Sequence, residues 1–388
     1  MAAEIQPTTQ RISSIDILRG FALLGIVMVN ALGFNASFFN FGGYYTSLPN
    51  ADQQSYYNIF ISLTADKFIF IFSFLFGYGI YMQYKKFLDN NKAFGGFFAR
   101  RMLVLALFGM LHVLLLWAGD ILLPYAIAGF IVFLLRKIPA GFQFALGMFF
   151  YLFTVFYLSA GVWITLPDSM SSTCTECLEQ AKMVYQNGSY FDILQLRLQE
   201  YFAFRNINLF YYLPKILGIT MMGFAASRFR LHEKIEKDRI FWAAMWLIFA
   251  GIAAFLYFNY ESFVVEGCPY AGAMYMGGYE LMNFFVAGTY ILTMLLLSSF
   301  QRVSNILKPL ANMGRMSLTN YLLQSVLLGF IFYGWGLCYF GMTEVTMVIK
   351  IALVVFLAEV FISHLWFQKY SIGPLERIWR RLSYGRRK

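Results

Sequence analysis

The sequence predicts an all-α fold, a polytopic transmembrane helical bundle, and three features of its composition support this. Hydrophobic residues make up 60% of the 388 residues, whereas soluble proteins contain roughly 45–50%. Charged residues are 13%, about half the usual share of roughly 25%. Aromatic residues reach 20%, which excludes a disordered chain because such chains are poor in large apolar residues. A soluble globule of this length could not bury so much apolar surface.

Ten apolar segments along the chain approach the roughly 20 residues that a membrane-spanning helix needs. The fourth segment is short, and only Gly119 and Asp120 separate it from the third, which indicates a tight hairpin. We expect one integral membrane domain over residues 1–388, with about ten spans. The predicted spans are Ile17–Asn35, Ile59–Met82, Met102–Ala118, Ile121–Leu135, Phe142–Leu166, Phe210–Ser227, Phe241–Tyr260, Tyr279–Ser299, Ser317–Phe340 and Thr346–Phe367.

The distribution of basic residues predicts that both termini are cytoplasmic. With the N-terminus inside, 24 of the 30 Lys and Arg residues fall in cytoplasmic segments or at their edges, as the positive-inside rule requires. The outer loops Ala36–Asn58 and Glu261–Gly278 contain none. This bias, together with attraction of the basic tail 368–388 to anionic lipid, accounts for most of the net charge of +10. Membrane lipids, and not a nucleic acid, are therefore the expected partners.

The longest outer loop, residues 167–209, is predicted to be a surface cap. Its stretch Tyr190–Phe204 has the pattern of an amphipathic helix with Leu194, Leu198 and Tyr201 on one face. The topology places every cysteine on the extracytoplasmic side, where disulfides persist. Structural disulfides and free apolar cysteines both remain open for these residues, and the loop has no histidine to complete a metal site. The cysteines are Cys174, Cys177, Cys268 and Cys338.

Ionisable residues at membrane depth are costly and therefore mark candidate functional sites. His112 is the strongest candidate, because it lies about ten residues into the third span, roughly 15 Å from the inner end, and an imidazole exchanges protons near neutral pH. Asp66 descends to a similar depth on the second span, where its carboxylate could raise the basicity of the imidazole. The alternative is a histidine buried for packing alone. The predicted outer group also contains Lys67, Asp120, Lys215 and Lys350.

A second polar group is predicted at the cytoplasmic end of the bundle. It comprises Asp16 and Arg19 on the first span and the polar start of the ninth span, including Asn320 and Gln324. Asp16 and Arg19 are three residues apart, so a local ion pair at the helix start explains them equally well. Arg19 could instead face a phosphate-bearing ligand, with Arg315 nearby.

Several ordered motifs are spread over nearly the whole chain. They are Asp16–Gly20, Val29–Asn30, Asp66–Gly79, Gly109–His112, Trp117–Asp120, Gly314–Ser325 and Gly373–Arg380. Together they resemble the YeiB-like family of bacterial multi-pass membrane proteins (domain of unknown function 418). The opening Asp-x-x-Arg-Gly followed by Val-Asn is also distantly similar to the membrane acyltransferase superfamily, whose members pass an acyl group from cytoplasmic acyl-CoA to a sugar on the far side. Those enzymes carry a catalytic histidine near their first two spans, and Gly20–Gln83 contains none.

This resemblance implies a protein of the bacterial cytoplasmic (inner) membrane that acts as an acyltransferase. His112 would be the general base, Asp66 or Asp120 would orient it, and Lys67 would stabilise the oxyanion. Acyl-CoA would be the donor, without a metal, and a glycan or small molecule would be the acceptor. The alternative is a transporter of a small polar or anionic solute, and the oligomeric state is left open, a homo-oligomer included. The residues expected to receive acyl-CoA are Asp16, Arg19, Arg315, Asn320 and Gln324.

Overall fold

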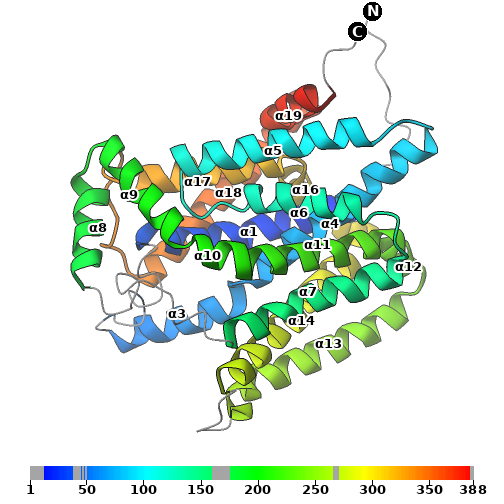
Figure 1. Ribbon diagram of the computed structural model, residues 1–388, viewed down its shortest axis with the longest axis horizontal. Helices are drawn as coiled ribbons and strands as arrows, with labels where there is room; N and C mark the ends of the chain where they lie inside the picture. The colour runs from blue at the N-terminus through cyan, green and yellow to red at the C-terminus, as the bar shows by residue number, and fades with distance from the viewer. Residues whose placement is uncertain are drawn as a thin grey trace, which may run out of the picture.

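The computed structural model describes residues 13–37, 45, 48, 50–159, 175–264 and 271–384, and within these ranges the regular structure is entirely helical. Figure 1 shows the longer helices running alongside one another as a bundle. The all-α prediction is therefore confirmed. The first half contains α1 (Ser13–Asn35), α3 (Ala51–Thr64), α4 (Lys67–Asp89), α5 (Gly95–Leu115), α6 (Leu122–Leu134), α7 (Ala140–Ser159), α8 (Thr175–Asn187), α9 (Tyr190–Ala203) and α10 (Arg205–Ile207).

The second half continues through a π-helical turn and further α-helices to a short amphipathic helix near the C-terminus. Its elements are η4 (Asn208–Tyr212), α11 (Leu213–Arg228), α12 (Leu231–Lys237), α13 (Arg239–Asn259), η5 (Tyr260–Phe263), α14 (Ala271–Ser298), α15 (Gln301–Ile306), α16 (Lys308–Arg315), α17 (Ser317–Phe332), α18 (Val345–Lys369) and α19 (Pro374–Tyr384).

Each of the ten predicted apolar segments overlaps a helix, but the predicted ninth span, Ser317–Phe340, is too long because α17 ends at Phe332. Among the described residues, seven helices are long and apolar enough to cross a membrane, and three apolar helices, Leu122–Leu134, Ala140–Thr154 and Ser317–Phe332, are shorter. The predicted second span, Ile59–Met82, is not one continuous helix, because the chain breaks between α3 and α4 at Asp66, whose φ is +61°. A residue with a positive φ cannot continue a right-handed α-helix, so the apolar run is divided there.

Helix α11 forms the centre of one half of the bundle and lies between α6 and α7 in Figure 1. Its contact with α4 depends on reciprocal glycines. A Cβ on Gly77 would collide with the carbonyl of Thr220, and a Cβ on Gly223 would collide with the carbonyl of Phe74. Small residues let two helix backbones approach closely, which is how helices associate when lipid offers no hydrophobic driving force.

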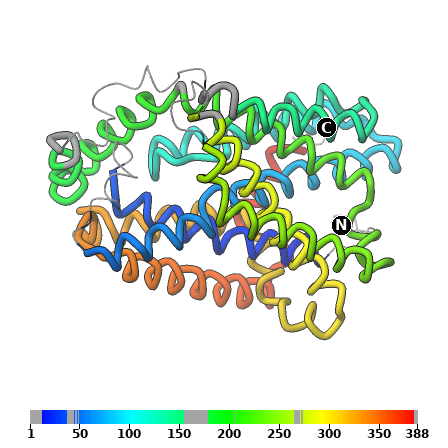
Figure 2. Tube along the Cα trace, turned by 90° about the horizontal axis from the view of Figure 1, so that it is seen from below, coloured from blue at the N-terminus to red at the C-terminus, as the bar shows by residue number. Residues whose placement is uncertain are grey.

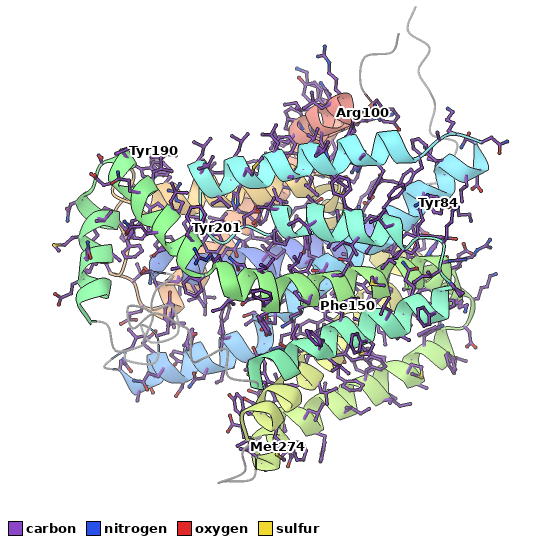
Figure 3. All side chains as sticks on the ribbon, in the orientation of Figure 1. Tyr84, Arg100, Phe150, Tyr190, Tyr201 and Met274 are labelled. Carbon is purple, nitrogen blue, oxygen red and sulfur yellow. The ribbon has the colours of Figure 1, made fainter. Side chains whose placement is uncertain are left out.

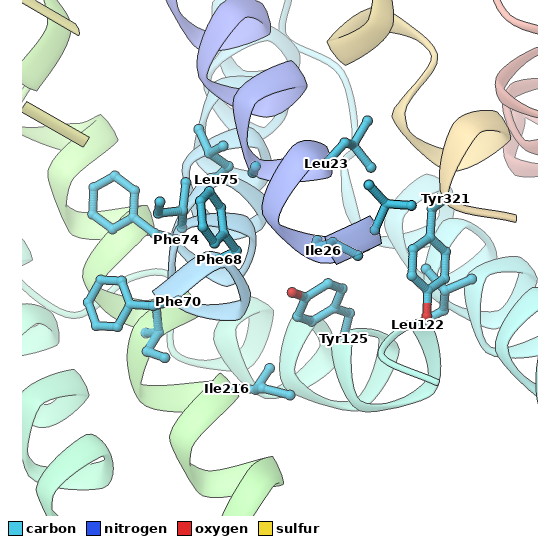
Figure 4. Packing of buried hydrophobic residues seen from close by; sticks show 14 of the residues in the cluster. Leu23, Ile26, Phe68, Phe70, Phe74, Leu75, Leu122, Tyr125, Ile216 and Tyr321 are labelled. Carbon is cyan, nitrogen blue, oxygen red and sulfur yellow. The ribbon is translucent and has the colours of Figure 1, made fainter. Parts of the chain in front are cut away.

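Helix α1 forms the centre of the other half and packs against α16, α17, α18 and α4. Gly25 leaves room for the ring of Phe68, which a Cβ would overlap. Figure 4 shows Leu23 and Ile26 of α1 between Phe68 and Leu75 of α4 on one side and Tyr125 and Tyr321 on the other. The middle of α1 and the start of α4 therefore belong to one continuous apolar core.

Helix α13 lies at the edge of the bundle and shows that the outer surface is suited to lipid. Only 11% of its most apolar window is buried, compared with 72% for Asn208–Arg228. Ile240 is 87% exposed and Phe258 is 80% exposed. A helix that is apolar on all sides and exposed would not be stable in water. The chain is therefore a multi-helix membrane protein.

Helices α8 and α9 lie at one end of the bundle (Figure 2). The segment that follows α17 packs against α8, since the Gly334 N–H donates to the Tyr185 carbonyl at 2.7 Å and the Gln186 amide donates to the Phe340 carbonyl at 2.7 Å. Cys338 has a free thiol, which donates to the carbonyl of Gln186. Cys174 and Cys268 lie outside the described residues, as does the side chain of Cys177, so the predicted disulfides stay a prediction.

The amphipathic helix predicted in the outer loop is α9, but its buried face differs from the predicted one. Ile193, Leu196, Arg197 and Glu200 are buried, whereas Leu194, Leu198 and Tyr201 are only partly covered. The reason is polar pairing, because Arg197 donates to the Leu114 carbonyl at 3.1 Å and Glu200 accepts from Ser37 and Tyr185, both at 2.6 Å. Figure 3 shows α9, with Tyr190 near its start and Tyr201 near its end, beside the C-terminal end of α5.

Candidate functional site

His112 lies in the last turn of α5 and is 1% exposed. The helix ends three residues later, and the Leu116 and Trp117 N–H groups both donate to the His112 carbonyl. Gly109, one turn earlier, allows the following segment to fold back over the imidazole. A Cβ at Gly109 would come within 2.6 Å of the Leu123 nitrogen and 2.9 Å of the Asp120 carboxylate. The Gly-x-x-His spacing therefore makes room for the partner of the histidine.

Asp120 is that partner and lies in the loop between α5 and α6. Its Oδ1 is 3.0 Å from His112 Nδ1, and its Oδ2 accepts the Leu123 N–H at 2.8 Å. The side chains of His112 and Asp120 are 0% and 1% exposed. A carboxylate oxygen only accepts, so Nδ1 carries the proton and Nε2 keeps its lone pair. Asp120 therefore sets the tautomer of the histidine and also caps α6.

Nε2 of His112 faces α17, where Ser325 Oγ lies 2.8 Å away. Tyr321, one turn earlier on α17, places its ring 5.1 Å from the imidazole and its hydroxyl 3.4 Å from the Gly119 carbonyl. Figure 4 shows Tyr321 beside Leu122, the first residue of α6. We call this series of side-chain contacts, Asp120–His112–Ser325, the histidine chain. It joins a loop and two helices that are more than 200 residues apart in sequence.

A second buried polar group, which we call the lysine network, centres on Lys215 of α11. The Lys215 ammonium is 2.7 Å from Glu280 Oε1 and 3.4 Å from Asp66 Oδ1. Three tyrosine hydroxyls complete the carboxylate contacts, since Tyr211 and Tyr151 donate to Glu280 and Tyr279 donates to Asp66. Every charged member therefore has a partner of opposite charge within the chain. The network contains Lys215, Glu280, Asp66, Tyr151, Tyr211 and Tyr279.

Lys67 lies beside the lysine network at the start of α4. It is completely buried, its ammonium lies 5.3 Å from the centre of the Tyr279 ring, and it has no hydrogen-bond partner among the described residues. A cation over an aromatic face is attracted by the ring quadrupole. Lys67 therefore belongs with Asp66 and Tyr279. No contact joins it to His112 in the described part of the chain.

The predicted cytoplasmic group is divided between partly exposed and buried side chains. Arg19 donates to Asp16 at 3.0 Å, and its side chain is 25% exposed. Gly314 packs against the Asp16 carbonyl, the Gly20 nitrogen and the Cβ of Arg19, which brings α16 and its last residue, Arg315, to the same end of α1. Arg315 lies 3.8 Å above the Phe367 ring and donates to the Ser371 carbonyl. Arg19 and Arg315 are thus accessible cations on neighbouring helices.

Asn320 and Gln324 are completely buried between α17 and α18. The Asn320 amide donates to the Met313 carbonyl at 3.1 Å and to Ser363 at 3.0 Å. The Gln324 amide donates to Glu359 Oε2 at 2.8 Å. These side chains use their donors to join helices, and the predicted role of Asn320 and Gln324 in receiving acyl-CoA stays a prediction.

The predicted outer group therefore forms two sites and a surface residue. His112 and Asp120 meet in the histidine chain, Asp66 and Lys67 lie with the lysine network, and Lys350 is exposed on α18. Sequence reasoning overlooked Glu280, although a carboxylate at the start of an apolar run is the signal that identified the others. It noted the hydroxyl of Ser325 without connecting it to His112. Within the described residues, no group of three or more His, Cys, Asp or Glu side chains could hold a metal ion.

Comparisons with known proteins agree with these motifs. The family described as "Protein of unknown function (DUF418)" matches residues 226–386. The chain is 29% identical to "Uncharacterized protein YxaH" of Bacillus subtilis (strain 168), over 98% of this chain and 97% of the relative. It is 26% identical to "Uncharacterized protein YeiB" of Escherichia coli (strain K12), over 96% of each chain. An "Uncharacterized 39.9 kDa protein in amylase 3'region" of Bacillus acidopullulyticus is 25% identical, over 97% of this chain and 95% of the relative. The chain is therefore similar to the DUF418 family over residues 226–386, and to YxaH and YeiB over nearly its whole length.

Proposed function

We propose that this protein is a membrane acyltransferase that moves an acyl group from cytoplasmic acyl-CoA to a glycan or small-molecule acceptor at the extracytoplasmic face. The observation that carries the proposal is the buried contact of 3.0 Å between His112 and Asp120, which makes Nε2 the nitrogen that accepts a proton. A positioned general base contributes roughly 10²–10⁴-fold to a rate. In an acyl transfer, the base would take the proton of the attacking hydroxyl or amine while the thiolate of CoA leaves.

The geometry favours Asp120 over Asp66 as the group that orients His112, because Asp66 contacts Lys215 and Tyr279 instead. The same geometry leaves no support for Lys67 as the oxyanion donor. The phosphates of acyl-CoA would be attracted by Arg19 and Arg315, the two partly exposed cations on neighbouring helices, because guanidinium groups bind phosphate oxygens in pairs.

We further propose ten spans with both termini cytoplasmic, in the inner membrane of a bacterium. The bias of 24 of 30 basic residues to one side supports this orientation. The three shorter apolar helices would complete the ten spans together with the seven long ones. Reporter fusions at the C-terminus and in the loop between α4 and α5 are expected to give the same cytoplasmic signal. A periplasmic signal from either position would contradict the orientation.

The direct test is acyl-CoA consumption by the protein purified in detergent, with candidate glycans and amines as acceptors. His112→Asn should lose acyl transfer by roughly 10²–10⁴-fold. The matched control is His364→Asn, since His364 is exposed on α18 and should retain the activity of the unchanged protein. Equal activity in His112→Asn and His364→Asn would exclude His112 as the base.

Transport of a small polar or anionic solute is the second candidate, and the broken helix at Asp66 favours it. Interrupted helices beside buried ionisable residues commonly form the substrate sites of transporters. Here α3 ends and α4 begins next to the ion pairs of Lys215, and a π-helical turn precedes α11. Uptake of labelled carboxylates or sugars into sealed vesicles without acyl-CoA would support transport. Absence of uptake, combined with acyl-CoA consumption, would support the enzyme.

A further inference from the structure

Ser325 has an unusual hydrogen bond for a buried helical serine. Serine in a helix commonly donates to the carbonyl four residues earlier, and Ser73 of α4 does so, with Oγ 2.7 Å from the Ile69 carbonyl. In Ser325 the corresponding distance, to the Tyr321 carbonyl, is 3.5 Å, whereas His112 Nε2 lies only 2.8 Å away. The serine hydroxyl is therefore directed toward the imidazole and not along its own helix.

The hydrogen bonds on the two sides of His112 are donated in one direction, from Ser325 through His112 to Asp120. Asp120 accepts the proton on Nδ1, so Nε2 is the acceptor for the Ser325 hydroxyl. An orienting carboxylate, a base and a hydroxyl, each within hydrogen-bond reach of the next, form the arrangement that activates a serine for nucleophilic attack. Ser325 is 1% exposed, so water is largely excluded from its hydroxyl.

We propose that Ser325 is a catalytic nucleophile that carries the acyl group as an ester between the donor and the acceptor. This inference rests on the proposed acyltransferase function and adds a covalent intermediate to it. It assigns His112 the role of base for Ser325 in the first half of the reaction and for the acceptor in the second. Asp120 is then a positioning residue for both halves.

The two half-reactions balance as follows. Ser325 Oγ forms a bond to the thioester carbonyl carbon, His112 Nε2 takes the hydroxyl proton, and the carbon–sulfur bond breaks. The thiolate of CoA takes the proton from His112 and leaves as the free thiol. The acceptor hydroxyl or amine then attacks the ester carbonyl of the acyl-serine while His112 takes its proton. The ester bond breaks, and His112 returns the proton to Ser325 Oγ.

A covalent intermediate makes two measurements possible without knowing the acceptor. Radiolabelled acetyl-CoA and palmitoyl-CoA are incubated with the purified full-length protein, and the modified residue is located by peptide mass spectrometry. Exchange of label between acyl-CoA and free CoA is followed in parallel, since it requires reversible formation of an acyl-enzyme. We expect one acyl group on Ser325 and exchange in the unchanged protein. Ser325→Ala and His112→Asn should lose both signals, with exchange falling by roughly 10²-fold or more.

Ser73→Ala is the matched control, because Ser73 is also a completely buried helical serine but bonds its own helix. It should keep labelling and exchange unchanged. Ser325→Cys retains a nucleophile and should form a thioester at the same position, which keeps the test valid if Ser325→Ala proves unstable. Acyl transfer by the unchanged protein without exchange, or labelling that survives Ser325→Ala, would overturn the proposal.

A fluorophosphonate probe separates failure of this inference from failure of the proposed function. The probe reacts with activated serines regardless of the natural donor. If it labels Ser325 only when His112 is present and neither acyl-CoA is consumed, the nucleophile stands and acyl-CoA is the wrong donor. If acyl-CoA is consumed in an acceptor-dependent reaction and the probe does not react with Ser325, the enzyme stands and the nucleophile is wrong.

Discussion

The histidine chain and the lysine network are both buried groups of polar side chains, but they differ in whether charged groups are paired with one another. In the lysine network, the carboxylates of Glu280 and Asp66 share the Lys215 ammonium and accept from tyrosine hydroxyls, and the Lys67 ammonium beside the network supplies the second positive charge. In the histidine chain, the polar contacts lead from a carboxylate through an imidazole to a hydroxyl. The first arrangement joins α4, α11 and α14, whereas the second leaves a group that can give up a proton.

This difference teaches that depth and charge alone do not separate a structural site from a chemical one. Removing one partner of a buried, fully hydrogen-bonded ion pair strongly destabilises the folded protein. A general base needs one nitrogen fixed and the other available. The lysine network should therefore govern stability and the histidine chain should govern activity, and four comparisons test that division.

The largest effect is expected from Lys215→Met. The change leaves Glu280 and Asp66 buried without their shared cation, and breaking a buried pair in this way costs about 3–5 kcal/mol. The thermal midpoint of the protein in detergent should fall, and activity should be lost together with the folded state. Lys350→Met is the control, because Lys350 is exposed on α18 and should change the free energy of unfolding by about 0.5 kcal/mol or less. Equal thermal midpoints of unfolding in the two variants would contradict a structural role for the lysine network.

His112→Asn should produce the opposite pattern. We expect acyl transfer to fall by roughly 10²–10⁴-fold because the base is lost. The free energy of unfolding should fall by only about 1–3 kcal/mol, the cost of leaving one buried polar partner unsatisfied. Initial rates and thermal unfolding are measured on the same preparation. A loss of stability as large as that of Lys215→Met, with the residual activity in proportion, would make His112 a structural residue.

A matched pair of Tyr→Phe substitutions compares the two groups directly. Tyr151 donates to Glu280 Oε2 at 2.9 Å, so Tyr151→Phe should cost about 1.5–3 kcal/mol, as expected for a bond to a charged group. Tyr321 donates over 3.4 Å to a carbonyl beside the histidine chain, so Tyr321→Phe should cost about 0.5 kcal/mol or less and leave the rate unchanged. A fall in rate for Tyr321→Phe close to that of His112→Asn would extend the histidine chain to this hydroxyl.

The smallest effect within the lysine network is expected from Asp66→Asn, which should cost about 1 kcal/mol because Glu280 still pairs with Lys215. The amide keeps an acceptor for Tyr279, and asparagine adopts a positive φ more readily than most residues. Asp66→Ala should be more destabilising, because it loses the acceptor for Tyr279 and places alanine at a φ of +61° that it rarely adopts. Chemical unfolding of the two variants in detergent gives the comparison. Equal destabilisation by Asp66→Asn and Asp66→Ala would contradict the preference for Asp or Asn at the break between α3 and α4.

The helices and His112 could be predicted from the sequence because their signals are local. Apolar runs of sufficient length form helices wherever they occur in lipid, and a single histidine in such a run is conspicuous. The pairing of polar residues could not be predicted in the same way. Asp66 and Asp120 were both reasonable partners for His112, and the choice depends on the fold of the Leu116–Ile121 loop and on Gly109.

The break at Asp66 and the role of Glu280 depend on contacts between distant segments. Lys215 and Glu280 are 65 residues apart, and Ser325 is 213 residues from His112. No periodicity or spacing in one sequence shows which helices touch, so these partners required the three-dimensional structure. The buried face of α9 was mispredicted for a related reason, since apolar periodicity does not reveal that Arg197 and Glu200 have buried partners.

The double role of Asp120 connects the proposed chemistry to the thickness of the membrane. One oxygen of Asp120 holds the first turn of α6, and the other holds His112. The 13 residues of α6 span only about 20 Å, less than the roughly 30 Å of a hydrocarbon core. A short helix responds to a thicker or thinner bilayer by tilting or by deforming the lipid around it. Movement of the first turn of α6 would draw Asp120 away from the imidazole, so the lipid composition itself would act as a regulator of the base.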